Sequence, residues 1–252
     1  MGSLPGKVCV LVPAHNCAPF LDELVKRTPF DGPDDEIIIL DDASTDGTFD
    51  IMNGRERVHI ERSERQLGYG GTSQRLYQIA LARGADFAVN IHGDLAHPPE
   101  IVPQIVAELR TGETDVILGS RNLFVSQAIK ANGWARFMKS DARNNMPVSR
   151  ILGHIGITAI QNFCYGMKVH SYHEGLRGVT RPVMEWVAGQ KMTAWYDFDA
   201  RMIVAAHRAH LRIREIPVPP KYIPEAVSGV PLIRYGLRTI WSAVRDNRFT
   251  LR

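Results

Sequence analysis

Short apolar runs rich in β-branched residues alternate along this 252-residue chain with segments of helical spacing, and this alternation constrains the fold most. The runs cover residues 8–12, 36–40, 58–60, 87–91 and 116–118, and the connecting helices are expected at 18–27, 45–52, 72–83 and 98–110. Strands that alternate with helices in this way form βαβ units and parallel sheets. We therefore predict an α/β fold with a doubly wound, mostly parallel sheet flanked by helices.

The second half of the chain is less regular. Residues 147–165 have helical apolar spacing, residues 210–218 alternate like a strand, and residues 231–252 form a basic amphipathic pattern. Such a basic helix can pack on its own domain or lie on a membrane surface, and the pattern alone does not choose between the two.

Cysteine usage and hydropathy indicate the compartment. Cys9, Cys17 and Cys164 are an odd number without metal-ligand spacing, which is typical of a reducing compartment such as the cytoplasm. We see neither an apolar run of the roughly 20 residues that a membrane span needs nor a secretory leader. We expect a cytoplasmic protein that is soluble or peripheral on the inner membrane face.

Charge is divided unevenly along the chain. Residues 1–120 carry a net charge of −9 and residues 121–252 a net charge of +12, and 23 of the 30 basic residues are arginine. Arginine suits bidentate recognition of phosphate, so the second half is expected to meet an anionic partner, although a solvated basic surface is the alternative. No recognisable reading helix or stacking platform accompanies the arginines, so we expect no nucleic acid partner.

Polar residues and glycines gather where the predicted strands end. Because ligands of such sheets bind beyond the carboxyl ends of the strands, these residues are the candidate site. They are Pro13, Ala14, His15 and Asn16; Asp41, Asp42, Ala43 and Ser44; Gly68 to Gly71; His92, Gly93 and Asp94; and Gly119, Ser120 and Arg121.

Two of these segments indicate a bound nucleotide, each with a plainer alternative. Asp41 and Asp42 can accept hydrogen bonds from a base or a ribose, but aspartates at strand ends also cap helices. The glycines at 68, 70 and 71 precede a helix, as in phosphate-binding turns, yet they match neither GxGxxG nor a P-loop. A dinucleotide-binding fold is therefore disfavoured, while Arg65 and Arg75 remain available to a phosphate or a base.

Taken together, these motifs resemble those of family-2 glycosyltransferases of the GT-A fold, in particular polyprenyl-phosphate hexosyltransferases of the dolichyl-phosphate mannosyltransferase kind. The matching segments are VPAHN, LDDASTDGT, LGYGGTSQRLYQIALARGAD, IHGDLAHPPEIVP and VILGSRN, followed by MPVSRILGHIGITAIQN, YHEGLRGVTR, YDFDARM and IREIPVPPKY. The resemblance implies a single GT-A domain over residues 1–252. Residues 1–120 would form its nucleotide-sugar half and residues 121–252 an acceptor half with the basic C-terminal helix.

The resemblance also implies roles for individual residues. Pro13, His15 and Asp42 would line the nucleobase and the ribose, with Arg65 near the base, and Asp94 would bind Mg²⁺ or Mn²⁺ together with the donor diphosphate. His92 could add a ligand, although a lone strand histidine is more often a packed residue. The remaining donor-binding candidates are Ala14, Asn16, Asp41, Gly70 and Gly93. This chain reads His-Gly-Asp at 92–94 where relatives often read Asp-x-Asp, so the metal site has few carboxylates.

The acceptor can be argued from its chemistry. A phosphate monoester is already anionic near neutral pH, its second pKa being about 6, so it needs cations rather than a general base. Arg121, Arg150 and Arg177 supply positive charge, and the predicted catalytic residues are Asp94, Arg121, Arg177 and Asp199. For a hydroxyl acceptor, the candidate bases are Glu174, Asp197 and Asp199, although Asp199 could simply pair with a neighbouring arginine.

We thus predict an inverting transferase that moves a hexose from a UDP- or GDP-sugar to a polyprenyl phosphate, using Mg²⁺ or Mn²⁺ and making peripheral contact with a membrane. Two alternatives stay open. One is transfer to a soluble hydroxyl acceptor such as a glycan or a natural product, and the other is a sugar-nucleotide-binding protein without catalysis.

Overall fold

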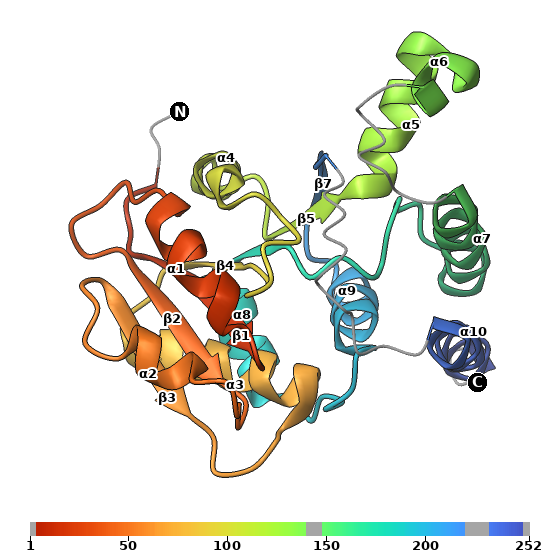
Figure 1. Cartoon of the computed structure of the whole chain (residues 1–252). Helices are drawn as coiled ribbons and strands as arrows, with labels where there is room; N and C mark the ends of the chain where they lie inside the picture. Colours follow the sequence, from red (N-terminus) through yellow and green to blue (C-terminus); the bar gives the residue numbers. More distant parts are fainter. Residues whose placement is uncertain (1–3, 140–147, 220–231, 249–252) are drawn as a thin grey trace. The chain divides into compact units, whose positions relative to one another are not determined.

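The computed structural model describes residues 4–139, 148–219 and 232–248, with side chains over 4–139, 151–219 and 236–244 (Figure 1). Its centre is a seven-stranded sheet in the order β3-β2-β1-β4-β6-β5-β7. The strands are β1 (Val8–Ala14), β2 (Glu36–Asp41), β3 (Val58–Arg62), β4 (Phe87–Asn90), β5 (Val116–Ser120), β6 (Arg177–Thr180) and β7 (Ile213–Pro217).

The first four strands are parallel, and β6 runs antiparallel to both of its neighbours, β4 and β5. All six residues of β2 are buried, as expected for a strand covered on both faces. The predicted mostly parallel sheet flanked by helices is confirmed.

The helices connect the strands largely where the sequence places them. They are α1 (Ala18–Arg27), α2 (Thr48–Met52), α3 (Gly68–Ala82), the 3-10 turn η1 (Pro99–Ile101), α4 (Val102–Arg110), α5 (Arg121–Asn132), α6 (Trp134–Lys139), α7 (Val148–Tyr165), α8 (Arg181–Gly189), α9 (Phe198–Arg208) and α10 (Leu232–Arg248). In the described part of the chain, none of these helices has the length and apolar character of a membrane span.

One strand is absent from the sequence-based prediction. The sequence-based prediction has no strand at residues 177–180, where β6 lies between β4 and β5. This strand is only four residues long, and it begins with Arg177, which is fully buried. Its Gly178 packs so closely against α4 that an added Cβ would lie 2.2 Å from Ile105 Cγ2. A short strand that contains a charge and a glycine lacks the apolar pattern of a buried strand.

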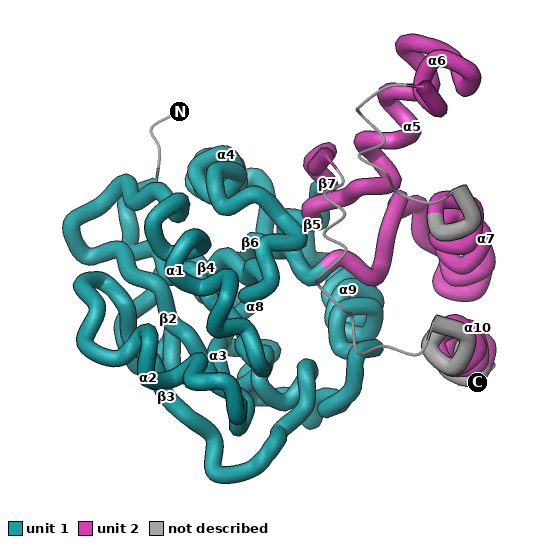
Figure 2. The backbone as a smooth tube through the Cα atoms, in the orientation of Figure 1, with its two compact units in different colours: residues 1–118, 175–214 teal, residues 119–174, 215–252 magenta. Residues whose placement is uncertain are grey.

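The chain forms two compact units (Figure 2). Unit 1 comprises residues 1–118 and 175–214, and unit 2 comprises residues 119–174 and 215–252. In unit 1, α3 packs on β1, β2 and α8. In unit 2, α7 packs on α10, and Val125, Phe137 and Ile151 form a small buried cluster. The sequence-based division at residue 120 into a nucleotide-sugar half and an acceptor half stays a prediction.

Candidate active site

Three turns at the carboxyl ends of parallel strands hold a non-glycine residue in the left-handed region of backbone space. Asn16 follows β1 with φ 53°, Ala43 follows β2 with φ 55°, and Leu95 follows β4 with φ 57°. Such conformations cost free energy, and they persist where the surrounding structure fixes them, which is common at functional sites. Three of the five non-glycine residues with a left-handed backbone in the described residues therefore lie at strand ends predicted from the sequence.

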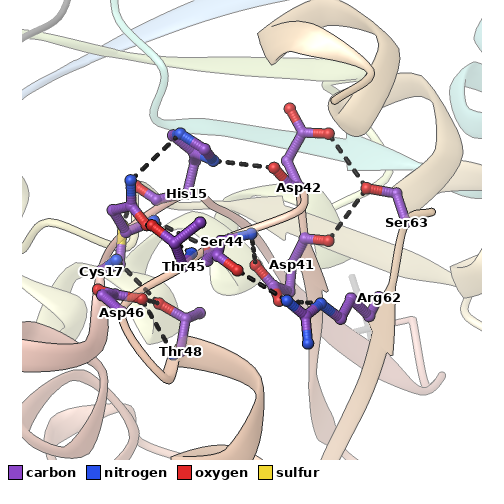
Figure 3. Close-up of polar contacts among 11 residues, drawn as sticks. His15, Cys17, Asp41, Asp42, Ser44, Thr45, Asp46, Thr48, Arg62 and Ser63 are labelled. Carbon is purple, nitrogen blue, oxygen red and sulfur yellow. Dashed lines mark hydrogen bonds and ion pairs between the residues drawn. The ribbon is translucent and has the colours of Figure 1, made fainter. Parts of the chain in front are cut away.

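The β1 and β2 turns are tied together by backbone and side-chain hydrogen bonds (Figure 3). Asp42 N donates to Ala14 O at 2.8 Å, and His15 Nδ1 lies 2.8 Å from Asp42 O. Because a carbonyl oxygen only accepts, His15 must carry its proton on Nδ1, and its Nε2 is then an acceptor for the amides of Asn16 and Gln66, each at 3.3 Å. The exposed imidazole of His15 is thus held in one orientation and one tautomer.

Asn16 links the same turns from the other side. Its backbone N–H donates to Ser44 Oγ at 2.9 Å, and its side-chain oxygen accepts from Thr45 N at 3.0 Å. Pro13 is half-buried and Ala14 is buried in β1, whereas Asn16 and Thr45 are exposed. The residues that could contact a nucleoside from solvent are therefore His15, Asn16 and Thr45, with part of Pro13.

The two consecutive aspartates point into the protein. Asp42 accepts from Leu67 N at 2.6 Å, Gly68 N at 3.0 Å and Ser63 Oγ at 3.2 Å, and it is 4% exposed. Its carboxylate therefore fixes the turn that leads into α3, and its contact with a nucleobase or a ribose stays a prediction.

Asp41 is fully buried at the end of β2. One of its oxygens accepts from Ser44 N at 3.0 Å, and the other lies 3.4 Å from Arg62 Nε. Arg62 also donates to Ser44 O at 2.7 Å, so it closes this turn. Arg62 was not among the site residues predicted from the sequence, because the predicted apolar run ends at residue 60, whereas β3 extends to Arg62. Arg65, which was selected, is exposed in the segment that follows β3.

The glycines in the first turn of α3 accommodate protein backbone. Gly70 N donates to Ala194 O at 3.0 Å, and a Cβ on Gly70 would lie 2.0 Å from Thr193 O. Gly68 adopts φ +76°, and a Cβ there would lie 2.6 Å from Ala194 O. This packing against residues 193–195 accounts for both glycines without a ligand, so contact of Gly70 with a diphosphate stays a prediction.

The β4 end presents one carboxylate. Asp94 is half-buried, and its Oδ1 accepts from Ala96 N at 3.0 Å, which closes a turn around Leu95. Gly93 packs closely against the residue that precedes α1, because a Cβ there would lie 3.2 Å from Cys17 Sγ. Burial raises the pKa of Cys17 to about 11, and the nearby charge of Asp94 contributes to the increase. Cys17 is thus a protonated thiol at neutral pH, packed beside Gly93.

The donor set around Asp94 fits a cation that takes its remaining ligands from a substrate. Among the described residues, no group of three or more His, Cys, Asp or Glu side chains could hold a metal ion by itself. A single carboxylate together with phosphate oxygens and waters is a common shell for Mg²⁺ and for similar hard cations. Asp94 therefore fits such an ion as its protein ligand.

His92 points toward Tyr69 and Gly175. Its Nε2 lies 3.3 Å from the Tyr69 hydroxyl, and the two rings meet edge to face at 5.5 Å. A Cβ on Gly175 would lie 1.6 Å from the same nitrogen, so the imidazole is tightly enclosed on this side. A role for His92 as a metal ligand stays a prediction.

Arg177 and Asp199, both predicted as catalytic, form a buried ion pair. The Arg177 side chain is fully buried in β6, and Asp199 lies in the first turn of α9. The Tyr69 hydroxyl lies 3.1 and 3.0 Å from the two Asp199 oxygens. Burial raises the pKa of Tyr69, so the phenol stays protonated and donates to the carboxylate. A chain of contacts thus runs from Arg177 through Asp199 and Tyr69 to His92, two residues before Asp94.

In unit 2, Arg121 begins α5 directly after β5. Its guanidinium donates through Nε and Nη2 to Glu174 Oε2, both at 2.6 Å, and Glu174 is 4% exposed. Ser171 Oγ lies 3.5 Å from the other Glu174 oxygen. Arg121 is therefore held by a buried carboxylate while its own side chain remains 23% exposed. The side chain of Arg150 lies outside the described residues.

The mostly parallel sheet flanked by helices is shared with solved glycosyltransferases of the GT-A fold. Glucosyl-3-phosphoglycerate synthase from Mycobacterium tuberculosis, in complex with Mn²⁺, UDP and glucosyl-3-phosphoglycerate, superimposes with a TM-score of 0.60 at 17% identity, over 95% of this chain and 80% of that one. A mannosyltransferase from Pyrobaculum calidifontis, in complex with GDP-mannose and Mn²⁺, gives 0.55 at 15% identity, over 86% and 57% of the two chains.

Sequence comparison places the chain in a family. The family model described as glycosyl transferase family 2 matches residues 9–185, and the chain belongs to this family. An undecaprenyl-phosphate mannosyltransferase from Micrococcus luteus is 25% identical over 95% of this chain and 98% of its own length. A UDP-N-acetylglucosamine–dolichyl-phosphate N-acetylglucosaminyltransferase from Methanococcus voltae is 22% identical over 93% of each chain. The predicted resemblance to polyprenyl-phosphate glycosyltransferases is confirmed.

Proposed function

We propose that this protein transfers a hexose from a UDP- or GDP-sugar to the phosphate of a polyprenyl phosphate, with inversion at the anomeric carbon. We choose an ionised phosphate acceptor over a hydroxyl acceptor because of the contacts of the three candidate general bases. Each already pairs with an arginine: Glu174 with Arg121, Asp197 with Arg201, and Asp199 with Arg177. In each carboxylate one oxygen already accepts from a guanidinium, which favours the ionised form and makes the group a weaker base toward a hydroxyl acceptor. An acceptor that is ionised before it binds needs no base.

The donor is assigned to the strand ends of unit 1. His15, Asn16, Thr45 and Pro13 would contact the nucleoside, since these side chains reach solvent at the β1 and β2 turns. Asp94 would hold Mg²⁺ or Mn²⁺, which supplies positive charge to the departing diphosphate. Asp41, Asp42 and Gly70 would support the donor site indirectly, because their contacts fix the turns that carry these side chains.

The reaction is a single displacement. A phosphate oxygen of the acceptor attacks the anomeric carbon from the side opposite the diphosphate, the bond from that carbon to the diphosphate breaks, and the nucleoside diphosphate leaves with the electron pair. Arg121 would bind the acceptor phosphate, and Glu174 would orient the guanidinium that does so. Arg177 and Asp199 are proposed as positioning residues that act through Tyr69 on the β4 end.

An acceptor with a polyprenyl chain resides in a membrane, so the proposal includes peripheral contact with the cytoplasmic membrane face. This part is supported by the Arg-rich C-terminal helix, whose sequence 232–248 holds four arginines and one aspartate.

The test is a transfer assay that separates lipid products from aqueous ones. The purified chain is incubated with Mn²⁺, with radiolabelled UDP- or GDP-hexoses and with undecaprenyl phosphate in detergent, followed by butanol extraction. We expect label in the organic phase with at least one donor, and its loss in Asp94→Asn. If label moves only to added water-soluble acceptors, the acceptor assignment is wrong. If nucleotides bind by calorimetry but neither transfer nor donor hydrolysis occurs, the protein is a binding protein.

A further inference from the structure

Over residues 236–244, where its side chains are described, helix α10 buries mainly small or polar residues and exposes large apolar ones. The buried residues in this range are Gly236, Thr239, Ser242 and Ala243, and Ile240 is half-buried. The residues it exposes include Leu237 at 67%, Trp241 at 60% and Val244 at 40%. Positions 237, 241 and 244 lie on one helical face, since residues three and four apart are neighbours. A helix that only packed on its own domain would bury these side chains instead.

Helix α7, on which α10 packs, also has an exposed apolar face. Leu152, Ile155, Ile160 and Phe163 are 55%, 45%, 41% and 87% exposed. The other exposed residues between them, Gly153, Gly156 and Ala159, are small and uncharged. The two helices approach closely, because a Cβ on Gly236 would lie 3.5 Å from Ile157 Cδ1. We call the seven large residues Leu152, Ile155, Ile160, Phe163, Leu237, Trp241 and Val244 the α7–α10 apolar surface.

The sequence of these two helices, and of unit 2 as a whole, is rich in basic residues. The two helices together contain five arginines and one aspartate, and unit 2 as a whole contains thirteen Lys and Arg against five Asp and Glu. Unit 1, in contrast, contains 17 basic and 22 acidic residues. An exposed apolar face that includes Trp, Phe and Leu, on helices whose sequence is rich in arginine, is typical of helices that lie in the interface of an anionic bilayer. A second copy of the chain fits less well, because pairing this surface with itself would bring two cationic helices together.

We propose that the α7–α10 apolar surface is a membrane-docking surface that takes the headgroup region of an anionic phospholipid bilayer, with Trp241 and Phe163 inserted. The inference extends the proposed function, because it locates the contact that a membrane-bound acceptor requires. It is nevertheless tested separately, because the binding needs no polyprenyl phosphate and no sugar nucleotide.

The experiment is co-sedimentation of the full chain with vesicles that contain no polyprenyl phosphate. We expect binding to vesicles of phosphatidylcholine and phosphatidylglycerol in equal amounts, weaker binding to phosphatidylcholine alone, and weaker binding at high salt. Trp241→Ser and Phe163→Ser should each weaken binding by about tenfold or more, the effect of removing one large apolar side chain from the interface. Trp134→Ser is the matched control, since Trp134 is a 43% exposed tryptophan on α6 outside the surface, and it should leave binding unchanged.

Two results overturn the proposal. One is that the chain does not bind the vesicles, or that it binds them equally well after both substitutions while far-ultraviolet circular dichroism shows an unchanged fold. The other is a dimer in sedimentation velocity that Trp241→Ser dissociates, since the surface would then bind a second copy. Transfer to a short-chain polyprenyl phosphate dissolved in water reports on the proposed function alone. Trp241→Ser should retain that transfer. The transfer assay therefore tests the proposed function, and vesicle binding separately tests the docking surface.

Discussion

Replacement of Asp199 by asparagine should destabilise the protein strongly, because Asp199 neutralises a guanidinium that has no access to water. Arg177 is fully buried, and the Asp199 side chain is 4% exposed. Removal of one partner of a buried ion pair costs about 3–5 kcal/mol, since the remaining charge is left uncompensated. In a chain of this length, that loss lowers the melting temperature by about 6–20 °C.

The assay is urea unfolding followed by circular dichroism, together with hydrogen exchange of the β6 amides. The exchange measurement matters because the chain forms two compact units, and a global curve need not be two-state. Glu185→Gln is the control, because Glu185 forms an exposed pair with Arg181 directly after β6, and exposed pairs contribute less than about 1 kcal/mol.

The double variant Arg177→Met with Asp199→Leu separates charge from packing. It removes both charges, so we expect it to be clearly more stable than Asp199→Asn. If Asp199→Asn costs no more than Glu185→Gln, or if the double variant is the least stable of the three, the argument that the pair exists to neutralise a buried charge is refuted.

Three further predictions concern the turns of unit 1. Asp94→Asn should abolish the increase in UDP or GDP affinity that Mn²⁺ produces in calorimetry and leave metal-free nucleotide binding unchanged; an unaltered metal effect would remove Asp94 from the cation site. Gly70→Ala should lower stability by about 1–3 kcal/mol in urea unfolding, because its Cβ would lie 2.0 Å from Thr193 O, whereas Gly189→Ala, with nothing within 4 Å, should cost far less. The Cys17 thiol has a pKa of about 11 in the folded chain and an ordinary pKa of 9.0 in the unfolded chain. Above pH 9 the unfolded chain therefore loses this proton while the folded chain keeps it, so the free energy of unfolding should fall as the pH rises. The slope of the urea midpoint between pH 9 and 10.5 should be shallower in Cys17→Ala, and an equal slope would contradict the raised pKa.

The fold was predictable as far as the apolar pattern follows strand and helix periodicity. The four parallel strands and the helices between them carry that pattern, and so do α7, β7 and α10. β6 was missed because Arg177 and Gly178 interrupt its pattern, and their burial depends on Asp199 and α4, which are distant in the sequence. The start of α3 was predicted four residues late, because its glycines favour a loop until residues 193–195 pack against them.

The candidate site was predictable in position but less so in the direction of its side chains. The strand-end rule locates His15, Asn16 and Asp94 at turns with strained backbone or solvent access. The same rule cannot tell that Asp41 and Asp42 turn inward, because that depends on Arg62 and on the amides of Leu67 and Gly68. Side-chain direction is decided by partners from other elements, which a single strand end does not reveal.

The opposite charges of the two units give the proposed division of labour a physical reason. The donor carries a diphosphate, and it is assigned to unit 1, in which acidic residues outnumber basic ones by 22 to 17. Charge in unit 1 as a whole therefore does not attract the donor, and a divalent cation at Asp94 would compensate the anions locally. The acceptor phosphate is assigned to unit 2, whose thirteen basic and five acidic residues attract an anion directly. On this argument, chelation should weaken nucleotide binding while added salt weakens acceptor and membrane binding, because the two anions are held by different kinds of positive charge.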